Sequence, residues 1–299
     1  MKKRHLKYLL LGLLSLVIVS IVGAIAMFTP PSAEALQAMV TPSNPQLGDT
    51  ISVSIQMEET AGNNGNAPVV VMDRHQYPAF LVGKDRWRAF IPTTPLDRPG
   101  ARQIQVVGAG QSQDFNLQLR DRSFPTQDIW FDASTASTEG TDLEFDRVDA
   151  FKKLVTPQKF WQGALLRPNE GPITSGFGVR RYYNGVFAND YYHRGVDYAG
   201  DTGSAVVTPA AGQVRLVGTV KQGFRIHGNV VGVDHGQGVE SIFLHLSRID
   251  VKEGDFIRAG QVVGGVGSTG SATGPHLHWG FYVHGAAVDP VPWRAQSIE

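Results

Sequence analysis

The stretch Gly274-Pro275-His276-Leu277-His278-Trp279 decides the fold of this chain, because it places two histidines two residues apart in a segment of strand character. Alternate side chains of a β-strand share one face, so His276 and His278 would lie roughly 7 Å apart along the strand, close enough to serve one site. A second fragment, His193-Arg194-Gly195-Val196-Asp197, adds a ring nitrogen and a carboxylate oxygen. Together the two fragments supply the ligand types of an open zinc site.

Histidine is concentrated in the C-terminal half of the chain, where seven of the nine histidines lie: His193, His227, His235, His245, His276, His278 and His284. A single histidine in a β-rich domain is more often a half-buried hydrogen-bonding residue than a ligand. His193 and Asp197 stand four residues apart, too far along a straight strand for one ion, so we expect Gly195 to mark a bend. His227, His235, His284 and the loop residue His75 are interpreted as residues without a function in the site.

The composition excludes several classes of function. Lys plus Arg (27) equals Asp plus Glu (27) in a chain of 299 residues, so no net charge would attract it to nucleic acid, which we exclude as a partner. The chain has no cysteine, which removes thiolate ligands, disulfides and a cysteine nucleophile and suits an oxidising compartment. Any metal must therefore be held by His, Asp or Glu.

Residues 1–35 have the composition of a secretion signal or a membrane anchor. Four Lys or Arg in Met1–Lys7 precede 21 uncharged residues, Tyr8–Phe28. Ala33-Glu34-Ala35 is a candidate cleavage site, yet the apolar run reaches the ~20 residues that span a bilayer. We favour an uncleaved anchor over a cleaved signal peptide, and expect an extracytoplasmic protein that is membrane-anchored or periplasmic.

Residues 36–123 are predicted to form an immunoglobulin-like β-sandwich. Short alternating segments such as Thr50–Ile55 and Gln103–Val107 are separated by Gly, Asn and Pro clusters about every ten residues. That pattern is typical of half-buried antiparallel strands in a sandwich, here without the disulfide. Nothing catalytic is visible in this domain.

Residues 124–164 are predicted to be a connector with one short helix. Leu143, Val148, Phe151 and Val155 recur at near-helical spacing, with Asp142 as the expected N-cap and Pro157 as the terminator. We expect the apolar stripe of this helix to pack between the two domains.

Residues 165–299 return to glycine-punctuated strand patterns, with no long amphipathic helix between them. Strands that follow one another without crossover helices pair largely antiparallel. The whole chain is thus expected to be mainly β, ending in an antiparallel β-rich domain.

Three ordered motifs of this last domain resemble the lysostaphin/LytM-like zinc metalloendopeptidases. They are His193-x-Gly195-x-Asp197, then Phe243-Leu244-His245-Leu246, then Gly270 to Trp279 with its His276-Leu277-His278 core. The resemblance implies a lysostaphin-type peptidase domain with one Zn²⁺ held by His193, Asp197 and His278, and with His245 and His276 as unligated catalytic histidines. Phe243 replaces the Tyr usual in the family, and Gly280 stands where relatives often have Glu.

The resemblance predicts hydrolysis of peptide bonds in peptidoglycan cross-links or stem peptides, with peptidoglycan peptides as the substrate. The composition of residues 1–35 adds the expectation of a membrane contact through the N-terminal segment. The alternative to an endopeptidase is a catalytically idle wall-binding regulator of a separate amidase. The chain retains all five metal-binding and catalytic residues that the resemblance implies, which argues against this alternative. A purely structural zinc fits poorly, because cysteine-free sites with three ligands are the open type. The sequence gives no indication of an oligomeric state.

Overall fold

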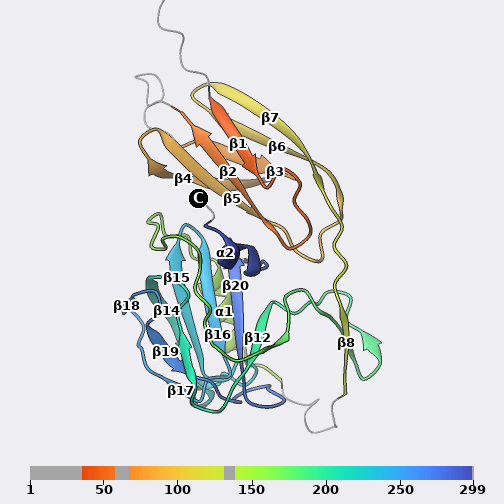
Figure 1. Cartoon of the computed structure of the whole chain (residues 1–299), viewed down its shortest axis with the longest axis vertical. Helices are drawn as coiled ribbons and strands as arrows, with labels where there is room; N and C mark the ends of the chain where they lie inside the picture. Colours follow the sequence, from red (N-terminus) through yellow and green to blue (C-terminus); the bar gives the residue numbers. More distant parts are fainter. Residues whose placement is uncertain (1–35, 58–66, 131–138, 298–299) are drawn as a thin grey trace, which may run out of the picture. The chain divides into compact units, whose positions relative to one another are not determined.

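Short strands joined by turns make up most of the described chain (Figure 1), which confirms the mainly β prediction. The computed structural model describes residues 36–57, 67–130 and 139–297, so the predicted anchor or signal in residues 1–35 lies outside the described residues. Within those ranges no helix is long and apolar enough to cross a membrane.

Seven antiparallel strands form the N-terminal part, in one continuous sheet of order β1-β2-β5-β4-β3-β6-β7. Strand β4 pairs with β3 through its first half and with β5 through its second, so the sheet can enclose a core that both halves share. The predicted strands around Ile51 and Ile104 are present, and both side chains are fully buried. The immunoglobulin-like character stays a prediction. The strands are β1 (Gln37–Thr41), β2 (Thr50–Gln56), β3 (Val69–Met72), β4 (His75–Gly83), β5 (Arg86–Pro92), β6 (Gly100–Gly108) and β7 (Gln111–Leu119).

The predicted connector holds a strand as well as a helix. Strand β8 (Thr126–Ile129) runs parallel to β10 (Arg180–Tyr183), which in turn pairs with β11 (Val186–Phe187). This small sheet joins the connector to the segment that leads into His193. A parallel pairing between strands more than fifty residues apart has no local sequence signature, and the sequence analysis missed it.

Helix α1 (Asp142–Lys152) exists as expected, but its N-cap and its buried face differ from the prediction. Thr141, not Asp142, is the N-cap, because its hydroxyl accepts from the Glu144 amide while the Glu144 carboxylate accepts from the Thr141 amide. The helix ends at Lys152, before Pro157 is reached.

The buried face of α1 is formed by Glu144, Val148 and Phe151, whereas Leu143 and Val155 are about half exposed. The helix packs on strand β14 (Gly212–Gly218) rather than between the two domains. Phe151 fits over Gly232 of the neighbouring strand, whose added Cβ would meet the ring at 2.7 Å. The predicted apolar face of the helix therefore began one residue too early, at Leu143. The residue that is buried at this end of the helix is Glu144, a carboxylate.

The C-terminal part is built on an antiparallel sheet of order β18-β14-β15-β16-β20-β12-β9, with β21 added beside β20. A smaller sheet of the same part has the strand order β13-β19-β17. The elements are β9 (Ile173–Ser175), β12 (Gly195–Ala199), β13 (Ala205–Val207), β14 (Gly212–Gly218), a 3-10 turn (Val220–Gln222), β15 (Val230–Gly236), β16 (Val239–Leu244), β17 (Arg248–Ile249), β18 (Phe256–Ile257), β19 (Val262–Gly265), β20 (His276–Val283), β21 (Ala286–Ala287) and α2 (Val291–Ala295).

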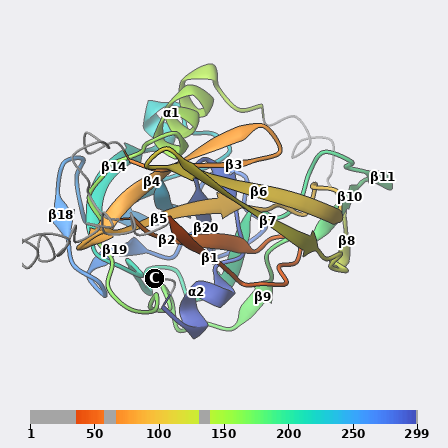
Figure 2. The ribbon, with the colours of Figure 1, turned by 90° about the horizontal axis from the view of Figure 1, so that it is seen from above.

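The two faces of β20 carry different residues, as strand alternation requires. Leu277, Trp279 and Phe281 are fully buried on one face, where Phe281 packs edge-on against Trp293 of α2. His276 and His278 stand on the other face, the side on which α1 lies. Figure 2 shows α1 and α2 on opposite sides of β20.

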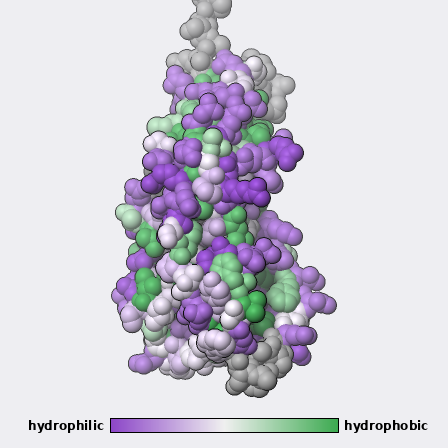
Figure 3. All heavy atoms as spheres, turned by 90° about the vertical axis from the view of Figure 1, so that its right-hand side faces the viewer, coloured by the Kyte–Doolittle hydropathy of each residue, from purple (hydrophilic) through white to green (hydrophobic). Residues whose placement is uncertain are grey.

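The N-terminal sheet meets the C-terminal part through aromatic residues near the Val283 end of β20. Phe90 of β5 belongs to the C-terminal core and packs edge-on against Trp293 at 5.1 Å between ring centroids. The Trp293 indole donates to the Thr50 hydroxyl at 3.2 Å. Most large apolar side chains of the described residues are buried. On the face drawn in Figure 3, the exposed hydrophobic residues form separate patches among hydrophilic ones.

Candidate metal centre and active site

Strands β12 and β20 bring one carboxylate and one imidazole together. Asp197 and His278 are direct cross-strand partners, so their side chains share a face of the sheet. The Asp197 Oδ1 and His278 Nδ1 atoms lie 2.9 Å apart. The two sequence fragments therefore meet through strand pairing.

His193 precedes β12 by two residues and is held by its backbone. Its amide donates to the Val179 carbonyl at 2.8 Å, and its own carbonyl accepts from the Gly178 amide at 2.9 Å. The ring Nδ1 donates to the Gly176 carbonyl at 2.7 Å. That bond makes Nδ1 the protonated nitrogen of the neutral ring and leaves Nε2 with a lone pair.

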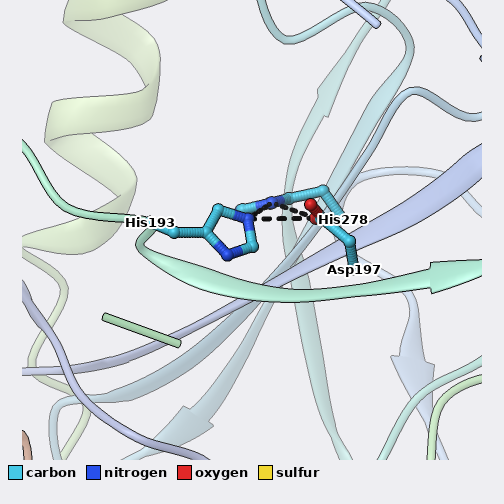
Figure 4. A group of neighbouring side chains, drawn as sticks. All are labelled: His193, Asp197 and His278. Atoms are coloured by element: carbon cyan, nitrogen blue, oxygen red, sulfur yellow. Dashed lines mark hydrogen bonds and ion pairs between the residues drawn. The ribbon is translucent and has the colours of Figure 1, made fainter. Parts of the chain in front are cut away.

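His193, Asp197 and His278 converge on one point (Figure 4). The His193 Nε2 atom lies 3.1 Å from Asp197 Oδ1 and 3.1 Å from His278 Nδ1. Two ligands of a tetrahedral zinc, at 2.0–2.1 Å from the ion, are separated by about 3.3 Å. The three atoms thus form a triangle of nearly the size that a small divalent cation needs.

Gly195 keeps this triangle small, for a reason other than the predicted bend. It is the first residue of β12, and its backbone is not in the left-handed region. A Cβ added there would lie 2.3 Å from the Trp279 carbonyl oxygen and 2.8 Å from His278 Nε2. Glycine is required because β12 and the His278 ring approach each other too closely for a side chain.

His245 follows β16 directly, and its backbone is turned into the left-handed region with φ of 63°. A non-glycine residue in that region is uncommon and costs about 1–3 kcal/mol of backbone strain, which clusters at functional sites. Its ring lies 4.9 Å from that of His276 and 6.3 Å from that of His278, between centroids. The turn therefore places the His245 ring between those of His276 and the triangle, so that four imidazoles lie close together.

Both flanking imidazoles are oriented by backbone carbonyls. His245 Nδ1 donates to the Thr269 carbonyl at 2.8 Å, and His276 Nδ1 donates to the Gly274 carbonyl at 2.8 Å. Each neutral ring therefore keeps its lone pair on Nε2. Carbonyl acceptors have no side-chain signature, so sequence reasoning could not identify Gly176, Thr269 or Gly274 as orienting residues.

Burial and hydrogen bonding set the charges of the cluster. Burial raises the pKa of Asp197, but hydrogen bonds from His193 and His278 outweigh it and hold the pKa well below its usual range. Burial lowers the pKa of His278, against the opposing effect of Asp197. Burial, reinforced by repulsion from His278 and His276, lowers the pKa of His245 to about 3. The centre thus combines an ionised Asp197 carboxylate with imidazole rings, which are donor types of a metal site.

The structure brings together all five residues singled out from the sequence, and their roles stay predictions. The remaining C-terminal histidines lie elsewhere, and two of them, His227 and His235, are hydrogen-bonded. His235 is buried between the Ala211 carbonyl and the Ser241 hydroxyl, and His227 pairs with Glu144. His284 packs near Tyr77.

Comparison with known proteins matches residues 191–290 to Peptidase family M23. These residues resemble an M23 peptidase domain. The matched residues contain all five clustered side chains, and the lysostaphin/LytM-like resemblance is confirmed.

Several M23 relatives are named for their activity. The chain is 40% identical over 119 residues to the DD-carboxypeptidase/endopeptidase Mpg of Neisseria meningitidis, covering 40% of this chain and 26% of the relative. It is 35% identical over 123 residues to lysostaphin of Staphylococcus staphylolyticus, covering 40% and 25%. The chain thus spans about a quarter of the length of these relatives.

One solved structure resembles both parts of the chain. It is described as a candidate M23 peptidase from Pseudomonas aeruginosa, with a TM-score of 0.60 and 27% identity. The match covers 84% of this chain and 94% of that one. The match therefore extends beyond the C-terminal part into the N-terminal sheet.

Proposed function

We propose that the protein is a zinc-dependent endopeptidase that hydrolyses peptide bonds in peptidoglycan cross-links or stem peptides during cell-wall remodelling. The observation that carries the proposal is the triangle of His193 Nε2, Asp197 Oδ1 and His278 Nδ1, with sides of 2.9–3.1 Å, flanked by two oriented imidazoles. The name of a further relative, the peptidoglycan DD-endopeptidase ShyC of Vibrio cholerae, supports the choice of wall peptides.

We assign one Zn²⁺ to His193, Asp197 and His278. The donor set fits, since two neutral imidazoles and one carboxylate are a common set for open zinc sites and leave one position for water or substrate. When bound, zinc supplies Lewis acidity, which polarises a carbonyl and lowers the pKa of water to about 7. The hydrogen bond from His193 to Gly176 is of the kind that orients metal-binding histidines.

His245 and His276 are assigned the proton transfers of the reaction. Each presents a lone pair on Nε2, because Nδ1 is committed to a carbonyl. We give His276 the role of base, which takes a proton from the attacking water. His245 is placed at the developing oxyanion or the leaving amine, to which its Nε2 would donate after taking up the proton that the attacking water loses. The two roles could be exchanged without changing the residues involved.

The substrate is proposed to be a peptide rather than the glycan strand. Glycoside hydrolysis normally uses two carboxylates on either side of the bond, and the cluster has one, already assigned to zinc. A surface hollow lined by Ala199 and Pro275 begins beside His276 and offers room for a peptide. Between a D-alanyl–diaminopimelate bond and a glycine bridge we favour the former, in keeping with the name of Mpg.

The domain boundaries are part of the proposal: anchor or signal peptide 1–35, sandwich 36–123, connector 124–164 and peptidase domain 165–299. An immunoglobulin-like sandwich is supported by its strand order, since constant-type domains pair strands A-B-E-D and C-F-G, the order of β1-β2-β5-β4 and β3-β6-β7. We propose an extracytoplasmic location, with residues 1–35 as the membrane contact. The idle-regulator alternative is not favoured, because no residue of the cluster is missing.

The bond that is cut can be tested on purified cross-linked peptidoglycan dimers. We expect conversion to monomers that carry a new amino terminus, identified by mass spectrometry. Release of reducing sugar ends with intact peptides, or faster degradation of casein than of dimers, would refute the substrate assignment.

A further inference from the structure

Glu144 on helix α1 lies outside the residues matched to the M23 family, yet it is fully buried against the segment that precedes β15. A carboxylate with no solvent exposure must be hydrogen-bonded to be tolerated. Its position at the third residue of α1 is fixed by the capping box with Thr141. The side chain is therefore held from its own helix and is available to bind a neighbouring segment.

The partners of Glu144 are in the loop at Ile226 and His227. The Ile226 amide donates to Oε2 at 3.1 Å, and the His227 amide donates to the same oxygen at 3.3 Å. The His227 ring donates through Nδ1 to Oε2 at 3.0 Å. One carboxylate thus satisfies two backbone donors and one imidazole, and fixes the conformation of this loop.

The same loop holds His245. The His227 carbonyl accepts from the His245 amide at 3.1 Å, at the residue whose φ is 63°. The Ile226 carbonyl accepts from the Ser271 amide at 3.0 Å. Thr269, two residues before Ser271, provides the carbonyl to which the His245 ring donates. The loop therefore contacts both the backbone of His245 and the segment that orients its imidazole.

A second set of bonds ties the two segments together. The Asn229 amide donates to the Thr269 hydroxyl at 2.9 Å, and the Asn229 side chain donates to the Leu246 carbonyl at 2.9 Å. Gly228 packs so closely on Thr269 that an added Cβ would lie 2.3 Å from its carbonyl oxygen. A displacement of the loop must therefore move Thr269, and with it the acceptor of the His245 Nδ1 proton.

We propose that Glu144 is a positioning residue for His245. Helix α1 of the connector then supports the active site by holding the loop that contacts His245. The inference rests on the proposed function, in which His245 takes part in catalysis. Loss of the carboxylate leaves the Ile226 and His227 donors without their partner, and the loop shifts to find another. A shift of about 1 Å in a group that acts on substrate can lower a rate by about 10²-fold.

The test compares the full-length wild-type protein with Glu144→Ala, Glu144→Gln and Asp146→Asn. Asp146 is an exposed carboxylate on the same helix, so its variant controls for the loss of one charge. We expect Glu144→Ala to lower kcat about 10- to 100-fold, with KM and zinc content close to wild type. Gln keeps one acceptor oxygen, so Glu144→Gln should recover part of the loss.

Hydrogen exchange at single amides supplies a readout that does not depend on activity. In zinc-free Glu144→Ala the His245 amide should exchange at least about tenfold faster than in wild type, while amides inside β16 and β20 keep their protection. The inference would be overturned by an unchanged exchange rate at the His245 amide, by an unchanged kcat, or by faster exchange throughout both strands. If Glu144→Ala does not fold, Glu144→Gln is judged by the same criteria. A wild-type protein inactive on peptidoglycan would contradict the proposed function alone, and the exchange measurement would still decide on Glu144.

Discussion

Replacing Gly195 with alanine should weaken the metal centre by separating the strands that form it. The added Cβ would lie 2.3 Å from the Trp279 carbonyl oxygen, where ordinary van der Waals contact begins at 3.4 Å. The obstacle is backbone, which cannot rotate away, so β12 and β20 must move apart locally by about 1 Å. Asp197 lies on one strand and His278 on the other. The distance between Asp197 Oδ1 and His278 Nδ1, now 2.9 Å, should therefore increase.

The expected consequence is a loss of zinc affinity of about 10- to 100-fold, the range found when residues supporting a metal site are changed. Overpacking adds a stability loss of about 1–3 kcal/mol. Zinc affinity is measured by competition with a coloured chelator, and stability by urea unfolding of the zinc-free protein. Gly274→Ala is the matched control, because an added Cβ there meets nothing within 4 Å and the carbonyl that binds His276 is kept. Zinc affinity of Gly195→Ala within twofold of wild type would refute the reasoning.

Three further results are expected. His278→Ala should lose both zinc and activity, measured by metal analysis and turnover, and stoichiometric zinc in this variant would remove His278 from the ligand set. His245→Ala and His276→Ala should keep zinc but lose about 10²–10⁴-fold in turnover, and a folded, zinc-free variant of either would make that histidine a ligand. Burial lowers the pKa of His235 to about 4 from 6.5, so the folded state favours the neutral ring. The neutral ring contributes about 3 kcal/mol to the free energy of unfolding. That contribution is complete above pH 6.5 and is lost as the pH falls toward 4. Urea midpoints at pH 7 and pH 5 should therefore differ less in His235→Asn than in wild type, and an equal difference would contradict this assignment.

Strand alternation made much of the site predictable. His276 and His278 share a face because they are two residues apart, and the strand that carries them was found from the same pattern. The pairing of Asp197 with His278 could not be read from either fragment, because it depends on the register of two strands about eighty residues apart. The motif resemblance supplied the grouping that local spacing left open.

The errors in α1 have two physical causes. Thr141 and Asp142 are both good N-caps, and the choice is made by Glu144, three residues after Thr141, which completes the capping box. That signal was present in the sequence. The burial of Glu144 was not predictable from periodicity, because its partners, Ile226 and His227, lie about eighty residues away.

Gly195 shows why a correct residue can be given a wrong reason. Glycine often marks an unusual backbone conformation, and a bend was the natural expectation. The actual constraint is the Trp279 carbonyl and the His278 ring on the adjacent strand. Such a close approach exists only after β12 and β20 have paired.

The most direct test of metal-dependent peptide hydrolysis is the digestion of purified sacculi by residues 36–299, followed by mass spectrometry of the released fragments. Metal-dependent peptide hydrolysis should yield fragments with newly formed peptide termini and intact glycan linkages. Release should stop when a chelator removes the metal and return when one equivalent of zinc per chain is restored. Equal release of peptide fragments with and without bound metal, or release of glycan fragments alone, would contradict the account.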